Sequence, residues 1–192
     1  DFASRMIACA VEYSEAQNIY RNAGGGNSTP YLRRCDAMRS YISYWLAPDV
    51  SEKTKAVNES WSVAKEALAI YDDAGDGHNY GKTFNQLSPT ANLICSYGED
   101  GKAYEETLKP TIECGERAIE HLSRLSDSEE LATAYAKTSA LLALYSVLCD
   151  WKEVAKYNQK TIEYFKKARD MSEAAALTDP SSFMMGWSMP TY

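Results

Sequence analysis

The residues best suited to chemistry fall in one stretch, from Asp72 to Thr83, where a phosphate loop and a calcium loop can both be tested. The segment Gly77–Thr83 places three residues between its first glycine and Gly-Lys-Thr, whereas a phosphate-binding loop has four and follows a strand. A calcium loop that starts at Asp72 would place Ala74 at position 3 and Thr83 at position 12, with no bidentate glutamate. Both comparisons favour an acidic helix end followed by a glycine turn.

Catalytic and metal sites need convergent side chains, and the other reactive residues are widely spaced. The two histidines, His78 and His121, form neither Glu-x-x-His nor His-x-x-x-His, and no Gly-x-Ser-x-Gly elbow occurs. The cysteines are odd in number, lack Cys-x-x-Cys spacing and fall within helical apolar patterns: Cys9, Cys35, Cys95, Cys114 and Cys149. This pattern favours reduced, buried thiols in a cytoplasmic protein. We therefore expect no enzymatic activity, no metal and no cofactor.

Length and charge exclude further classes. The 192 residues are 45% apolar and 24% charged, a composition typical of a folded soluble domain. The net charge of −7 argues against nucleic-acid binding. The longest strongly apolar run, Ser139–Cys149, is too short to cross a bilayer, and the residues after Asp1 do not have the pattern of a signal peptide. We expect no membrane insertion.

The elements that must position these residues are helices. Apolar residues recur at intervals of three and four, as in Leu141, Leu142, Tyr145 and Leu148, and no stretch alternates like a half-buried strand. The chain is therefore predicted to be all-α. The predicted helices span residues 3–23, 29–47, 50–74, 79–97, 101–125, 128–148, 150–169 and a short 171–177.

Capping residues and prolines mark the boundaries of these helices. Thr29-Pro30 is typical of a side-chain cap followed by proline at the first helical position. Asp49 with Glu52 resembles a capping box. Pro89 and Pro110 lie inside predicted helices, and each should kink or split its helix because proline removes a backbone donor. Pro89 is equally compatible with a fresh helix start.

An internal repeat is the most informative feature. The segment Glu15–Gly24 resembles Glu66–Gly75 at an offset of 51 residues. A weaker copy lies at Ala118–Asp127, again offset by 51, and a fourth at Thr161–Asp170, offset by 43. One helix pair cannot bury its own apolar stripe, whereas stacked pairs can, so the repeat predicts an array of helix pairs.

The sequence resembles tetratricopeptide repeats. Asp150–Ile162 is similar to the turn and second helix of that motif, and Leu141, Leu142 and Tyr145 fall where its first helix has core residues. The likeness covers most of residues 3–170, although the repeats exceed the usual period of about 34 residues. The resemblance implies a right-handed superhelical solenoid of about seven antiparallel helices. It also implies a concave face, lined by the first helix of each pair, that binds a peptide or another protein.

Candidate ligand contacts follow from that resemblance. Three helically spaced sets would face the concave side: Arg33, Asp36, Ser40 and Ser43; Asn85, Ser88, Asn92 and Cys95; and Ala136, Ser139, Ala143 and Ser146. The alternative is that they are plain solvent-facing positions of amphipathic helices. Arg33, Arg34 and Arg39 could receive a carboxylate or phosphate, or simply pair with nearby acids. Tyr41, Tyr44 and Trp45 are hot-spot candidates by residue type. The predicted ligand-binding residues are Arg33, Tyr41, Tyr44, Asn85, Asn92 and Ser139.

Residues 1–170 are predicted to form the repeat domain, and residues 171–192 a short helix and a tail or linker. The apolar tail residues around Trp187 could cap the solenoid end, lead into another domain or occupy the groove. The sequence predicts a non-enzymatic module that binds protein or peptide, with homo-oligomers through the tail or the solenoid end. The alternative is a sensory domain of a larger regulator that binds a small molecule in the groove.

Overall fold

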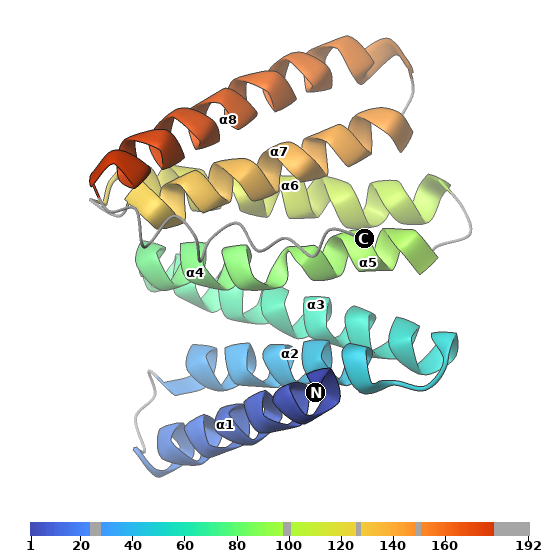
Figure 1. Ribbon diagram of the computed structural model, residues 1–192, viewed down its shortest axis with the longest axis vertical. Helices are drawn as coiled ribbons and strands as arrows, with labels where there is room; N and C mark the ends of the chain where they lie inside the picture. The colour runs from blue at the N-terminus through green and yellow to red at the C-terminus, as the bar shows by residue number, and fades with distance from the viewer. Residues whose placement is uncertain (24–27, 98–100, 126–127, 149–150, 179–192) are drawn as a thin grey trace.

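The computed structural model describes residues 1–23, 28–97, 101–125, 128–148 and 151–178. These residues form helices and no strand, which confirms the all-α prediction (Figure 1). The helices of the described residues are α1 (Phe2–Asn22), α2 (Thr29–Leu46), α3 (Val50–Asp73), α4 (Gly77–Leu87), α5 (Pro89–Tyr97), α6 (Gly101–Ser123), α7 (Ser128–Leu148) and α8 (Trp151–Thr178).

The helices are stacked in chain order, from α1 at one end to α8 at the other (Figure 1). Each long helix packs against the next one along the chain, and α4 also contacts α2 and α7 directly. Helices α2, α4 and α7 are therefore neighbours in one layer. Helices α1 and α8 stand at the two ends, where each packs chiefly against a single partner.

The two internal prolines behave differently. Helix α4 ends at Leu87 and α5 begins at Pro89, so Pro89 starts a fresh helix, while the backbone N–H of Ser88 still bonds to the Phe84 carbonyl at 2.8 Å. Pro110, by contrast, lies inside an undivided α6, and the expected split is absent. Pro110 is on the exposed face of α6. A carbonyl that loses its helical donor on an exposed face can bond to water instead, so a proline there is tolerated.

The last helix differs from the prediction. Helix α8 runs unbroken to Thr178, so the predicted end at residue 169 and the separate helix 171–177 are wrong. Arg169 bonds to Asp170 at 2.6 Å and reaches Glu173 at 3.7 Å, and these ion pairs bridge the expected break. The domain boundary expected at residue 170 therefore falls within a continuous helix. The tail residues 179–192 lie outside the described residues.

Helix caps are partly as predicted. Asp49 accepts a hydrogen bond from the Glu52 backbone N–H at 2.9 Å, which is the N-cap half of the expected capping box. Thr29 is not a cap, because it is the first residue of α2 and Ser28 precedes it without a side-chain cap bond. Gly75 ends α3 with a φ of 69°, a conformation that glycine adopts without steric cost.

The core is a continuous chain of contacts from α2 to α7 that follows the repeat. Ala67 in α3 and Ala118 in α6 are fully buried, as are Tyr71 and Leu122 at the same offset of 51 residues. The equivalent Tyr20 in α1 is only half-buried, because α1 has a helix on one side alone. The burial pattern thus confirms the repeat register in α3 and α6.

Helix α7 is long and apolar enough to cross a membrane by length and hydropathy alone. Its apolar character also fits its position, since it packs between α6 and α8 and contacts α4. Leu141 and Leu142 are fully buried there. A core helix with neighbours on several sides has little polar surface to display.

Candidate functional site

Aromatic side chains gather where α2 ends and where α1 and α3 begin. Tyr41, Tyr44 and Trp45 lie on one side of α2 because they are three and four residues apart. The Trp45 ring lies 5.0 Å from the Tyr44 ring and 6.2 Å from the Tyr41 ring, both edge-on. Phe2 of α1 adds a third edge-on contact, 5.7 Å from Trp45. The structure thus joins two predicted ligand residues, Tyr41 and Tyr44, in one aromatic group.

Exposed apolar residues lie at the same helix ends as this group. Phe2 is 55% exposed, Leu46 40% and Val50 61%, whereas Tyr44 is buried and Trp45 half-buried. Helix α2 ends at Leu46, because Ala47 takes the extended conformation that a following proline, Pro48, favours. Only three residues therefore separate Leu46 from Val50. We name Phe2, Trp45, Leu46 and Val50 the edge patch. The sequence patterns did not single out Phe2, Leu46 or Val50. The short connection from α2 to α3 is evident in the sequence, but nothing there shows that α1 begins beside the end of α2.

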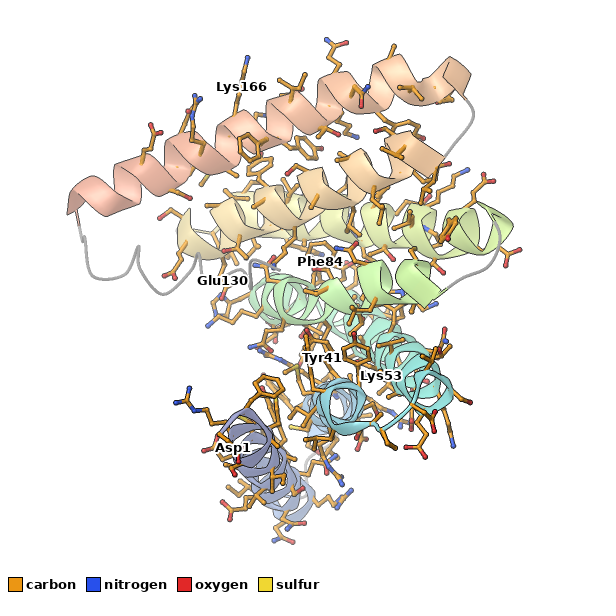
Figure 2. All side chains as sticks on the ribbon, turned by 45° about the vertical axis from the view of Figure 1, so that its right-hand side comes forward. Asp1, Tyr41, Lys53, Phe84, Glu130 and Lys166 are labelled. Atoms are coloured by element: carbon orange, nitrogen blue, oxygen red, sulfur yellow. The ribbon has the colours of Figure 1, made fainter. Side chains whose placement is uncertain are left out.

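The surroundings of the edge patch carry charges of both signs, because Asp1 adjoins Phe2 and Asp49 adjoins Val50 in the chain. The Lys53 ammonium lies 5.9 Å from the centroid of the Tyr44 ring, within cation–π range. Figure 2 labels Lys53 and Tyr41. Burial raises the pKa of Tyr41, and a hydrogen bond with Trp45 opposes this only in part. The Tyr41 hydroxyl therefore stays protonated at neutral pH. This arrangement suits an apolar group with a carboxylate nearby.

The arginines of α2 point to different helices and do not form one cluster. Arg33 pairs with Glu66 of α3 at 3.2 Å, and both side chains are about half exposed. Arg34 donates from Nε and from an Nη atom to Gln86 of α4, at 3.0 and 2.7 Å. These exposed contacts link α2 to its neighbours. Arg33 pairs with an acid, as the alternative expected, whereas Arg34 bonds to an amide.

Gln17 is a buried polar residue that the sequence patterns missed. It is 1% exposed and accepts a hydrogen bond from Arg39 at 2.9 Å, while its amide nitrogen donates to Asp36. Asp36 was expected on a concave face, but its carboxylate faces α1. Gln17 occupies the repeat position of the buried Leu68, where a long polar side chain is surprising from sequence alone.

Asn85 and Ser139 are buried. The sequence patterns predicted these residues either on a concave ligand-binding face or on a solvent-facing side of the helix, and neither expectation holds. Asn85 of α4 donates to the Glu130 backbone carbonyl at 2.9 Å and to its carboxylate at 2.6 Å. Ser139 donates to the Ala136 carbonyl of its own helix at 2.8 Å. Asn92 of α5 is half-buried. The expected open face over α4 and α7 is absent at Asn85 and Ser139 because α4 packs directly against α7.

His121 belongs to a cluster that joins three helices. Its Nε2 lies 2.8 Å from Oδ1 of Asp72 in α3, its ring lies 5.1 Å from the ring of Tyr80 in α4, and Arg117 also reaches Asp72 at 3.1 Å. An Asp–His pair can act as a base when a nucleophile adjoins it. The nearby Tyr80 is a poor one, since burial raises its pKa strongly. The contacts of the cluster connect α3, α4 and α6.

Within the part of the chain that the structure describes, no group of three or more His, Cys, Asp or Glu side chains could hold a metal ion. The four described cysteines are free thiols, of which Cys35 and Cys95 are buried. Cys149 lies outside the described residues. The expected burial of the cysteines therefore holds for Cys35 and Cys95, whereas Cys9 and Cys114 are half-buried.

Comparison with known proteins was made at three levels. No protein-family model matches the chain, and neither curated proteins nor solved structures include a significant match. The likeness to tetratricopeptide repeats therefore stays an expectation from the sequence. Function has to be inferred from the surface and packing of the helices.

Proposed function

We propose that this chain is a non-enzymatic protein-interaction module, built as a solenoid of tetratricopeptide-like helix pairs. The edge patch is the surface that binds a large apolar side chain of a partner protein or peptide. The supporting observation is the aromatic group of Tyr41, Tyr44 and Trp45 beside the exposed Phe2. Aromatic residues in such groups bury a large area on binding at a low cost in side-chain entropy.

The surroundings of the patch suggest the chemistry of the partner. Leu46 and Val50 extend the apolar surface, and the Lys53 ammonium lies at its border over the Tyr44 ring. A segment with an aromatic or aliphatic anchor and an adjacent carboxylate would fill the apolar surface and pair with Lys53. Arg33, Asn85 and Ser139 contribute less to this proposal, because they already bond within the fold.

The test begins with a random-peptide display selection on the full immobilised chain. The selected peptides are then titrated against the chain by calorimetry. We expect Trp45→Ala and Phe2→Ser each to weaken binding by at least about tenfold, as hot-spot truncations do. Val147→Ser is the matched control, because Val147 is an exposed apolar residue on α7, far from the patch in the stack.

The variants distinguish loss of a binding contact from loss of the fold. Binding that is equal in wild type, Trp45→Ala and Phe2→Ser would reject the edge patch as the site. Loss of binding in the Val147→Ser control as well would indicate a general folding defect, which circular dichroism of each variant reveals. Selected peptides without an apolar anchor would contradict the proposed partner chemistry.

A small-molecule sensor is the second candidate function. The buried Asn85 Oδ1 and Ser88 Oγ have no hydrogen-bond partner among the described residues, and they lie one turn apart on α4 and its end. Buried polar atoms without partners are costly, and a small polar ligand that reached both atoms would satisfy them. A thermal-shift screen against polar metabolites tests this function. A ligand that stabilises the wild type and not Asn85→Leu would support it.

A further inference from the structure

The outer face of α1 carries an apolar strip that no described helix covers. We name Ala3, Ile7, Ala8 and Val11 the α1 strip, since these residues share one face of the helix. Ile7 is 55% exposed and Val11 51%. Helix α1 packs chiefly against α2, on the opposite side. Side chains of this kind are normally buried.

The internal repeat shows that the strip is specific to α1. At an offset of 51 residues, the positions of Ile7 and Val11 correspond to Asn58 and Ser62 of α3, which are exposed and polar. At the next offset of 51 they correspond to Lys109 and Glu113 of α6, which are exposed and charged. The face that meets solvent in α3 and α6 is thus apolar in α1 alone of these three helices.

The α1 strip also differs from the face that, in α3, packs against the preceding helix α2. Helix α3 contacts α2 through Ser60, whose hydroxyl donates to the Ala37 carbonyl at 2.8 Å, and through the buried Trp61. The equivalent residues of α1 are Cys9 and Ala10, outside the strip. A helix placed before α1 in the same register would therefore leave the strip uncovered.

Charged residues beside the strip favour a second copy of this chain as its occupant. Arg5, Glu12 and Glu15 lie along one flank, are exposed, and form no ion pair with the described residues. When two copies of α1 pair antiparallel about a two-fold axis, each flank meets the same flank of the other copy. A crossing near Ala8 and Val11 places Arg5 of one copy opposite Glu12 and Glu15 of the other. A parallel two-fold pairing would instead set this flank against the uncharged opposite flank of the other copy, so these charges would not pair.

We propose that the α1 strip is a homodimer interface in which two copies of α1 pair antiparallel, with Ile7 and Val11 at its centre. Arg5 of each copy pairs with Glu12 and Glu15 of its mate. A helix of 21 residues is about 31 Å long, so one helix pair gives an interface at the small end of the usual range. The dimer should therefore depend on concentration.

Sedimentation equilibrium of the full chain tests the proposal. From about 5 to about 500 µM, the weight-average mass should rise from 21.4 kDa towards twice that value. Ile7→Lys with Val11→Lys should raise the dissociation constant by at least about tenfold. The matched control is Asn58→Lys with Ser62→Lys, which makes the same change at the equivalent positions of α3 and should leave dimerisation intact.

Charge reversal tests the orientation. Arg5→Glu alone should weaken the dimer, and adding Glu12→Arg with Glu15→Arg should restore it. A monomer at every concentration, or a dimer unaffected by the two lysines in α1, overturns the proposal. Failure of the triple charge swap to restore the dimer overturns the antiparallel arrangement. Trp45→Ala should still dimerise, so this test and that of the edge patch fail independently.

Discussion

Nε2 of His121 lies 2.8 Å from Oδ1 of Asp72, and this contact joins α6 to α3 where α4 begins. Gly77, the first residue of α4, lies against the same imidazole, since a Cβ added there would be 2.8 Å from the His121 Cβ. One histidine therefore holds three helices together, and the close approach requires glycine at position 77.

Acid should weaken the Asp72 cluster. Burial, the largest single influence, raises the pKa of Asp72, but hydrogen bonds from His121 and Arg117 together with their charges outweigh it and lower that pKa. Because the folded pKa lies below the unfolded one, the cluster's contribution to stability is complete above about pH 4 and is lost as pH falls through the folded pKa. Asp72→Asn should reduce the free energy of unfolding at pH 7 by about 1 kcal/mol.

Urea unfolding at several pH values measures this effect, and the difference between wild type and Asp72→Asn should shrink at low pH. Asp73→Asn is the control, because Asp73 is the exposed neighbour of Asp72. If the loss of unfolding free energy in Asp72→Asn stayed constant down to the lowest pH, the pH dependence of stability would not come from the Asp72 carboxylate.

Gly81 should not tolerate a side chain. A Cβ at position 81 would lie 2.5 Å from Cδ1 of the buried Leu122. Alanine favours a helix over glycine by about 1 kcal/mol, but the overlap should cost more, so we expect Gly81→Ala to lose about 1–3 kcal/mol overall. Thermal unfolding checks this loss. In a Leu122→Ala background, which removes the overlapping atoms, the same Gly81→Ala change should become neutral or stabilising.

Asn85 should matter for stability more than for peptide binding. Its amide bonds to two oxygens of Glu130 across the contact between α4 and α7. Asn85→Ala should therefore lower the free energy of unfolding by about 1–3 kcal/mol while peptide affinity at the edge patch is unchanged. Asn58→Ala, a change at an exposed asparagine of α3, should cost less. Unchanged stability with lost peptide binding would return Asn85 to the ligand site.

Cys95 should resist alkylation. Burial raises the pKa of its thiol to about 11. At pH 8 only about one molecule in a thousand then carries the thiolate, which is the reactive form. Mass spectrometry after brief iodoacetamide treatment should find Cys95 unmodified in the native chain and modified in urea, with a native rate that increases as pH rises. Rapid native labelling at pH 8 would show that the helix contacts around Cys95 open readily.

The sequence by itself determined the helices and their repeat. Apolar spacing of three and four residues specifies which face of a helix avoids water, and this local rule holds whatever the neighbours are. The register from Ala67 to Ala118 was readable for the same reason, because equivalent positions in stacked pairs bury similar side chains. The aromatic pair Tyr41 and Tyr44 could be nominated by residue type alone.

Only the tertiary structure decided which polar residues face a neighbour. Asn85 and Gln17 have the side chains of surface residues, yet they are buried, and each forms hydrogen bonds with a residue of another helix, Glu130 and Arg39 respectively. Phe2 joins Trp45 although 43 positions separate them in the chain. Local periodicity assigns a face to each helix, but the pairing of faces depends on contacts between distant segments, and no local pattern encodes those contacts.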